Sequence, residues 1–251
     1  MRKYIIAGNW KMHGSHANVQ TLLTTLKQDI KVNSKAEMIV FPPFVFLEQT
    51  RQLLNHTSLK WGAQNVAVEK IGAFTGEISA NMLLEFGCQY VLVGHSERRA
   101  LYGETDEIIA KKFLLAKEAG LIPILCIGET LMQRQQGLTE AVISEQLNAI
   151  LQLPGAAKNL CQAIVAYEPV WAIGTGQTAT PEQAQQIHTY LRQQVAKHDQ
   201  SIADQLCILY GGSVKSANAE ALFSMPDIDG GLVGGASLEA EEFLKIYQAV
   251  K

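Results

Sequence analysis

The chain has 251 residues, of which 47% are hydrophobic and 18% are charged, and its formal net charge is −3. This length is enough to bury a large core, and charges of both signs are spread along the chain, so neither nucleic acid nor a membrane surface is expected as a partner. No segment approaches the run of about twenty apolar residues that crosses a bilayer, and the apolar stretch Tyr4–Ala7 is too short for a secretion signal, so we expect a cytoplasmic protein.

Short apolar runs recur along the chain at a spacing of about thirty residues, which is the length of a βα unit. Pro123 falls within the fifth of these runs, where it is tolerated only near the start of a strand. The runs predict eight strands: Tyr4–Gly8, Glu37–Phe41, Lys60–Gln64, Tyr90–Gly94, Ile122–Ile127, Ala163–Tyr167, Cys207–Tyr210 and Gly231–Val233.

The segments between these runs have helical periodicity, and several carry signals for a helix start or stop. One predicted helix starts at Thr105 and stops at Gly120. Another begins with the capping sequence Thr180–Gln183, which places proline at the first helical position. The last follows Ser237, with Val250 as the final residue of its core face.

Strict alternation of apolar strands with helices predicts a parallel sheet covered by helices. Two arrangements of this sheet remain possible: an open, doubly wound sheet and a closed barrel. Eight βα units in about 250 residues are typical of a (β/α)₈ barrel, which we favour. No linker or change of composition marks a boundary, so residues 1–251 are expected to form a single α/β barrel domain.

The cysteines give no sign of a disulfide framework or of a metal site. All four, Cys88, Cys126, Cys161 and Cys207, are far apart, and we expect reduced, mostly buried thiols. The close pair His13 and His16 lies in a glycine–serine turn without a cysteine or an H-E-x-x-H pattern, so it favours no metal.

Polar residues follow three of the predicted strands, at the end of a barrel where active sites are built. Asn9 and Lys11 follow the first strand, and the period of two puts them on one side. His95 and Glu97 follow the fourth strand, and Glu168 follows the sixth. Each alone is commonly a surface or structural residue, but their joint occurrence at strand ends favours a catalytic site.

Glycine pairs follow the last two predicted strands. Gly211 and Gly212 precede Ser213, and Gly234 and Gly235 come just before a helix. Paired glycines let backbone N–H groups approach an anion, and the loops after strands seven and eight of barrels commonly hold phosphate. Tight turns explain one such pair, whereas two at these positions favour a phosphate site.

The order and spacing of several long motifs carry a resemblance to a known family. AGNWKM, VGHSERR, GAFTGEIS, CIGET, AYEPVWAIGTG, YGGSV and LVGGASL together span the chain from its first strand to its last helix. In these motifs the sequence resembles the triosephosphate isomerases. Phe74 stands where that family often has tyrosine, a difference that touches no catalytic position.

The resemblance implies an isomerase that interconverts dihydroxyacetone phosphate and D-glyceraldehyde 3-phosphate, in glycolysis, gluconeogenesis and the pentose shunt. It implies no cofactor and no metal. Glu168 would be the base, His95 a neutral electrophile, and Lys11 and Asn9 would stabilise an enediolate, with Glu97 as a neighbouring acid. The same residues Asn9 and Lys11 would touch substrate, and its phosphate would bind at Gly174, Ser213, Gly234 and Gly235.

The resemblance also implies a lid and a homodimer. Pro169–Trp171 would stiffen one end of a flap that closes over the phosphate, and Gly174–Gly176 would free the other end. GAFTGEIS is similar to the loop with which family members clasp their partner, so that Thr75 would pack beside the partner's Asn9 and Lys11.

Two other functions fit the barrel less well. A Schiff-base aldolase needs a lysine desolvated inside a strand, whereas Lys11 comes after one. A phosphate-binding protein without catalysis would be expected to lose the acid–base residues, and this chain keeps them.

Overall fold

The computed structural model describes residues 2–30, 35–172 and 178–250. Its strands follow the predicted runs with changes of one residue or none at each end. They are β1 (Tyr4–Asn9), β2 (Ala36–Phe41), β3 (Lys60–Ala63), β4 (Tyr90–Val93), β5 (Ile122–Ile127), β6 (Ile164–Tyr167), β7 (Cys207–Tyr210) and β8 (Gly230–Val233).

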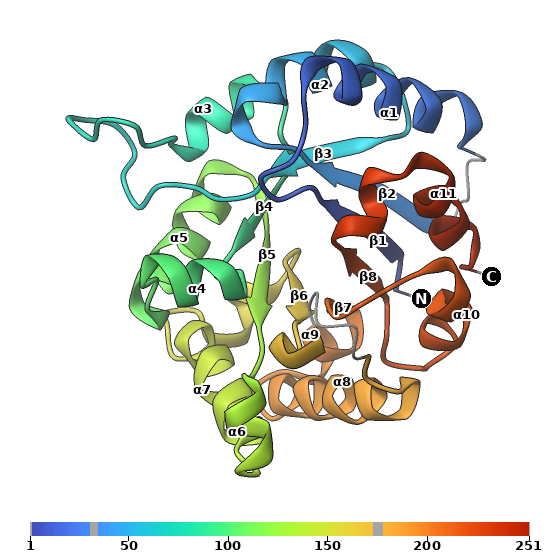
Figure 1. Ribbon diagram of the computed structural model, residues 1–251. Helices are drawn as coiled ribbons and strands as arrows, with labels where there is room; N and C mark the ends of the chain where they lie inside the picture. Colours follow the sequence, from blue (N-terminus) through green and yellow to red (C-terminus); the bar gives the residue numbers. More distant parts are fainter. Residues whose placement is uncertain (1, 31–34, 173–177, 251) are drawn as a thin grey trace.

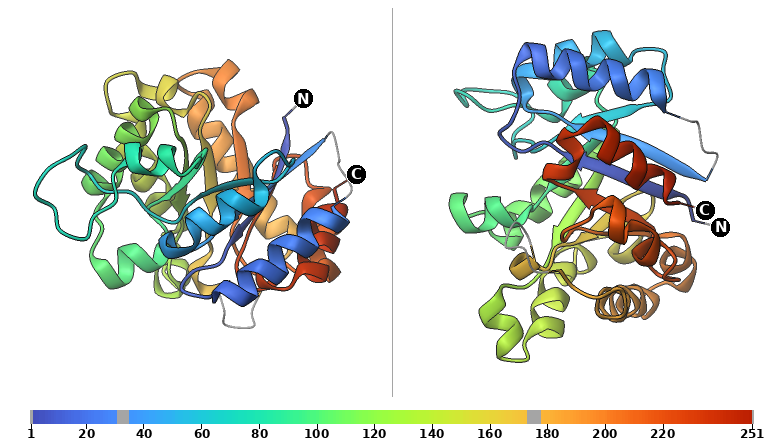
Figure 2. Two further views of the ribbon diagram at one scale, coloured as in Figure 1. Left: turned by 90° about the horizontal axis from the view of Figure 1, so that it is seen from above. Right: turned by 45° about the vertical axis from the view of Figure 1, so that its right-hand side comes forward.

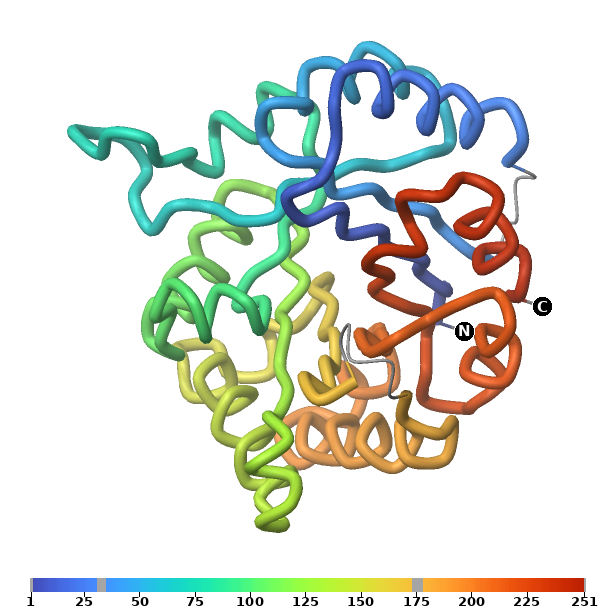
Figure 3. Tube along the Cα trace, in the orientation of Figure 1, coloured from blue at the N-terminus to red at the C-terminus, as the bar shows by residue number. Residues whose placement is uncertain are grey.

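The eight strands pair in chain order and close into a barrel, because β1 pairs in parallel with β8. Helices surround the barrel on its outer side (Figure 1). Closure leaves no sheet edge, so the barrel expected from the sequence is confirmed and the doubly wound alternative is excluded. The first strand and the last helix pack together, and the two ends of the chain lie near each other (Figure 3).

Both faces of the sheet are buried, which explains why the strand sequences are continuously apolar. Along β1, Ile6 packs into the layer between sheet and helices, whereas Ile5 and Ala7 point into the barrel. The barrel interior is filled by apolar side chains such as Phe41 and Leu92 and is not a channel. This filled interior is the rigid base on which the strand-end residues stand.

The α-helices connect successive strands. They are α1 (His16–Asp29), α2 (Leu47–Leu54), α3 (Ala80–Glu85), α4 (Ser96–Tyr102), α5 (Asp106–Ala119), α6 (Leu131–Gln135), α7 (Thr139–Leu151), α8 (Pro181–Ala196), α9 (Gln200–Gln205), α10 (Ser216–Phe223) and α11 (Ala240–Gln248). Short 3₁₀ turns are η1 (Phe44–Phe46), η2 (Ala156–Leu160), η3 (Val170–Ala172) and η4 (Gly235–Leu238).

The predicted helix signals act as expected in two cases. Thr105 caps α5, which ends at Gly120 in the left-handed conformation with φ of 99°. Thr180 forms the capping box of α8. The last helix differs from the prediction, since Ser237 lies in η4 and α11 ends before Val250, which is nevertheless buried.

The connection between β3 and α3 is the longest loop of the carboxyl-end face. It spans residues 64–79 and projects well away from the barrel (Figures 1 and 2). Thr75 lies in it and is exposed.

The prediction that the cysteines are mostly buried is half right: Cys88 and Cys126 are buried, but Cys161 is exposed and Cys207 is partly accessible.

Candidate active site

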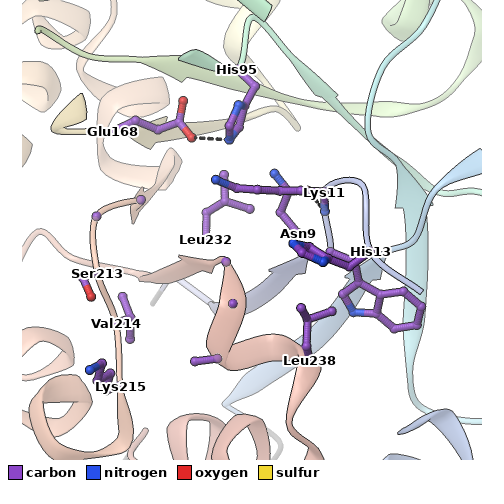
Figure 4. Close-up of a pocket in the computed structure, with 16 residues that line it drawn as sticks. Asn9, Lys11, His13, His95, Glu168, Ser213, Val214, Lys215, Leu232 and Leu238 are labelled. Atoms are coloured by element: carbon purple, nitrogen blue, oxygen red, sulfur yellow. Dashed lines mark hydrogen bonds and ion pairs between the residues drawn. The ribbon is translucent and has the colours of Figure 1, made fainter. Parts of the chain in front are cut away.

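A pocket of about 350 Å³ opens at the carboxyl ends of the strands. It is bordered by residues that follow β1, β4, β6, β7 and β8 (Figure 4). Of the residues singled out from the sequence, those that line it are Asn9, Lys11, His13, His95, Glu168, Gly211, Gly212, Ser213, Gly234 and Gly235. Glu97 lies beside the pocket, Thr75 lies on the projecting loop, and Gly174 lies outside the described residues. We call this space the active-site pocket.

Glu168 follows β6 directly and is only 2% exposed. Its backbone N–H donates to the carbonyl of Ile127 over 2.7 Å, which continues the β5–β6 ladder by one bond. Its carboxylate has two partners: Oε1 lies 2.9 Å from Nε2 of His95, and Oε2 accepts the backbone N–H of Ser96 over 2.9 Å. A buried carboxylate is thus held by two donors, which is what a buried charge requires.

Two glycines leave room for Glu168. A Cβ on Gly128 would stand 1.8 Å from the Glu168 carbonyl oxygen, and one on Gly211 would stand 2.8 Å from its Cγ. Real side chains cannot make such contacts without moving the backbone or the carboxylate. These glycines therefore set the direction in which Glu168 points, and Gly211 has a packing role rather than a phosphate role.

His95 caps the N-terminus of α4, and this placement fixes its tautomer. Its Nδ1 accepts the backbone N–H of Glu97 over 3.2 Å, so Nδ1 carries no proton in this contact. The proton is then on Nε2, which donates to Glu168. The geometry is that of a neutral imidazole with its one N–H directed at the carboxylate (Figure 4).

The buried pair shifts the pKa of both its members. Burial is the largest single influence and lowers the pKa of His95, but the charge and the hydrogen bond of Glu168 together with the charge of Glu97 outweigh it and raise the pKa above 6.5. Burial raises the pKa of Glu168, but the nearby His95 and the Ser96 N–H together lower it below 4.5. The two shifts depend on each other: the pKa of Glu168 would rise if the His95 N–H were lost, and the pKa of His95 would fall if Glu168 lost its charge.

Lys11 reaches the pocket by a backbone turn and not by strand alternation. The strand β1 ends at Asn9, and Lys11 has φ of 51°, an uncommon conformation for a residue with a Cβ. The Asn9 side chain accepts the Lys11 N–H over 3.0 Å, and the Gln64 amide donates to the Lys11 carbonyl over 2.9 Å. The prediction that Asn9 and Lys11 share a side is right in outcome, but its reason is wrong.

The Lys11 ammonium pairs with Glu97 at 2.5 Å from Nζ to Oε1. The other Glu97 oxygen lies 3.8 Å from Nδ1 of His95. Since the Glu97 side chain is 44% exposed, water screens this pair and it adds little stability. The pair acts instead by positioning Lys11, because it holds the ammonium group at the pocket mouth, on the side of His95.

The opposite wall is formed by backbone and differs from the acid–base side. A Cβ built on Gly235 would meet nothing within 4 Å, and one on Gly234 would meet only Cε of Lys11, at 3.8 Å. Packing therefore does not require glycine at either position. Their missing side chains leave open space beside Ser213, within the active-site pocket.

The start of the predicted flap is tied to a buried carboxylate. Glu129 accepts the indole N–H of Trp171 over 2.9 Å and the Tyr167 hydroxyl over 3.2 Å. Its carbonyl also accepts the Val170 N–H. The Arg134 guanidinium stacks 4.4 Å from the Trp171 ring centre. Residues 173–177, where the rest of the predicted flap falls, lie outside the described residues.

Sequence reasoning missed three residues that hold this site. Ser96 acts through its backbone N–H, Gln64 through an amide that bridges two loops, and Glu129 through buried acceptor oxygens. Glu129 lies in the motif CIGET and Ser96 in VGHSERR, so membership of these motifs could have indicated both residues. Gln64 had none beyond its place at a strand end.

The fold and the site together define a class of protein: a (β/α)₈-barrel enzyme with a carboxylate–imidazole pair at the carboxyl ends of its strands. The sequence profile of the family described as Triosephosphate isomerase matches residues 4–250. The chain is 53% identical to the triosephosphate isomerase of Nitrosococcus oceani over 249 residues, which cover 99% of both chains. It is 55% identical to that of Thiobacillus denitrificans over 249 residues, again 99% of both. To that of Coxiella burnetii it is 53% identical over 247 residues, 98% of this chain and 97% of the relative.

The chain belongs to the triosephosphate isomerase family and is an isomerase. The resemblance found in its motifs is thereby confirmed.

Proposed function

We propose that the protein interconverts dihydroxyacetone phosphate and D-glyceraldehyde 3-phosphate by moving one proton between adjacent carbons. The observation that carries this proposal is the contact of Glu168 with a neutral His95 at the wall of a pocket whose other wall is open glycine backbone. A base and an electrophile on one side and room for an anion on the other match a small phosphorylated carbonyl compound.

Glu168 is the base in this mechanism. It takes the proton from the carbon next to the carbonyl, which leaves an enediolate, and it returns a proton to the neighbouring carbon. Such a positioned base typically contributes about 10²–10⁴-fold to the rate. The contacts with His95 and Ser96 hold the carboxylate ionised while it waits for substrate.

His95 stabilises the enediolate by donating its Nε2 hydrogen to the developing oxyanions. The charge of Glu168 raises the pKa of this histidine, and that charge disappears when Glu168 takes up the substrate proton. Burial and Lys11, which both lower the pKa of His95, then act with the Glu97 N–H on Nδ1 to keep the ring neutral. A neutral imidazole matches an enediol in acidity better than an imidazolium does.

Lys11 and Asn9 complete this side of the pocket. The lysine supplies a positive charge near the substrate oxygens, and the left-handed backbone fixes where that charge stands. Holding such a conformation costs on the order of 1 kcal/mol or more, an expense that the Asn9 and Gln64 hydrogen bonds offset. Glu97 positions Lys11 and is a second candidate for proton transfer among the substrate oxygens.

The phosphate binds at the open wall, to backbone N–H groups of Gly234 and Gly235 and to Ser213. Support comes from the unfilled space at both glycines and from their place at the start of η4, where Gly234 is the N-cap and Gly235 the first residue. Gly174 and the flap are proposed to close over this phosphate, as the resemblance implies.

We propose that the protein works as a homodimer through the loop of residues 64–79. Large apolar side chains are exposed, among them Met12 at 95% after β1, Ile71 at 89% in this loop and Leu101 at 73% on α4. Exposed apolar patches of this kind mark interaction surfaces. Thr75 would pack beside the partner's Asn9 and Lys11, which would bring the loop to the rim of each pocket.

No helix of the described residues is long and apolar enough to cross a membrane. Among the same residues no three His, Cys, Asp or Glu side chains are grouped as metal ligands. A cytoplasmic location, a place in glycolysis and gluconeogenesis and a cofactor-free reaction remain predictions.

The test is a coupled assay that follows D-glyceraldehyde 3-phosphate formed from dihydroxyacetone phosphate. Turnover by the purified protein supports the proposal, and absence of turnover by a folded protein would overturn it. Borohydride added with substrate provides the control for an aldolase, because a Schiff base would be trapped as a stable adduct and an enediolate would not.

A further inference from the structure

A second cavity, of about 310 Å³, borders the catalytic carboxylate. It is bounded by the start of α4, the end of β5, the start of α6 and the residues after β6, and we call it the rear chamber. Its lining includes Ser96, Arg99, Ala100, Cys126, Thr130 and Glu168. The active-site pocket and the rear chamber thus have Glu168 in common as part of their walls.

The two carboxylate oxygens contact residues that line different cavities. Oε1 contacts His95, which lines the active-site pocket. Oε2 accepts the N–H of Ser96, which lines the rear chamber. Glu168 is only 2% exposed, so its carboxylate can exchange a proton only with molecules in these two cavities.

The rear chamber has the size and polarity to hold water. At about 30 Å³ for each water, its volume has room for several molecules. Arg99 and the hydroxyl-bearing Ser96 and Thr130 supply polar atoms around it, and a buried water needs two to four such partners. Cys126 is no rival acid there, because burial and the charge of Glu168 raise the pKa of its thiol well above 9.0.

The active-site pocket cannot serve the same purpose during turnover. A bound triose phosphate lies between Glu168 and the pocket mouth, and the reaction intermediate is kept from water there. The carboxylic acid formed by proton abstraction then has the rear chamber as its neighbouring space.

We propose that the rear chamber is the route by which protonated Glu168 exchanges its proton with solvent while the intermediate is bound. This inference rests on the proposed function. The abstracted proton is carried on one carboxyl oxygen, and a turn about the soft terminal torsion of the side chain brings that oxygen to the chamber. There the acid hydrogen passes to a water and a hydrogen of that water returns to the carboxyl, so that charge and atoms balance.

The experiment measures the fate of the migrating hydrogen. Unlabelled dihydroxyacetone phosphate is converted in D₂O, and proton NMR gives the ratio of product that keeps the substrate hydrogen to product that has acquired deuterium. Ala100 is the position to vary, because it lines the chamber on α4 and is itself exposed, so it lies where the chamber meets solvent. The series Ala100→Ser, Ala100→Val and Ala100→Leu narrows the chamber by steps, with the serine variant as the matched control of similar size.

A narrowed chamber is expected to raise the ratio of retained to exchanged hydrogen severalfold in Ala100→Leu, less in Ala100→Val and hardly in Ala100→Ser. Turnover should stay close to wild type, since no catalytic group changes. The valine variant keeps the test decisive if the leucine variant does not fold.

An unchanged ratio across folded, active variants would overturn the proposal, as would an equal rise in the serine control. If the wild-type protein forms no isomer at all, the proposed function fails instead, so the two failures are distinguishable.

Discussion

The two walls of the active-site pocket are built in different ways. On one wall the groups are already paired with each other: Glu168 with His95, and Lys11 with Glu97. On the other wall Gly234 and Gly235 leave space that packing does not require. The difference teaches that one wall is organised to hold charge in a fixed geometry before substrate arrives, whereas the other is shaped to be filled by the ligand.

The largest effect is expected from Glu168→Gln, which removes the base from the paired wall and keeps its shape. Turnover should fall by about 10²–10⁴-fold or more, because no other group can take the carbon-bound proton. The coupled assay measures it, with circular dichroism as the control for folding. Turnover close to wild type would mean that Glu168 is not the base.

A smaller loss is expected from His95→Gln, which removes the donor to the enediolate. Loss of one such donor typically lowers kcat by about 10²–10³-fold. The variant also removes the group that lowers the pKa of Glu168, so that pKa should rise. Because activity needs the ionised carboxylate and is lost as pH falls through its pKa, the acid limb of the kcat/KM profile should move to higher pH. A limb that stays in place would show that His95 does not set the charge of Glu168.

The comparison is sharpened by two glycine substitutions, one on each wall. Gly235→Val places a side chain in the open space and should raise KM about tenfold, a loss of about 1.4 kcal/mol in binding, with a smaller change in kcat. Gly211→Ala puts a methyl group against Cγ of Glu168 and should lower kcat instead. Steady-state kinetics of both variants separate the walls. If both variants changed KM and kcat in the same way, the two walls would not have different roles.

The smallest effect is expected from metal removal. Activity should survive dialysis against a chelator without change, since both walls work through side chains and backbone. A loss of activity that only a divalent ion restores would show that the pocket needs a metal.

Much of the fold and the site could be predicted from particular runs of residues. The strands followed from apolar runs such as Ile122–Ile127, and strand-end placement brought His95 and Glu168 together, because a parallel barrel collects its carboxyl ends on one face. The left-handed turn at Lys11 and its hold by Gln64 could not be predicted. They depend on the distance between two loops, and a lysine in that conformation has no local sequence signal.

The glycine pairs show the same limit. The pattern Gly-Gly is identical after β7 and after β8, yet Gly211 is required by contact with Glu168 whereas Gly235 faces open space. Only the packing around each residue distinguishes a glycine that aims a neighbour from one that leaves room for a ligand.

The central claim, that the two walls have separate tasks, is tested most directly by binding a ligand that engages only one of them. Glycerol 3-phosphate carries the phosphate but no carbonyl group, so isothermal titration should give nearly the same Kd for the wild-type protein and Glu168→Gln. Gly235→Val should bind it clearly more weakly. If Glu168→Gln weakens this ligand as much as Gly235→Val does, the phosphate is not held at the glycine wall and the division between the walls is wrong.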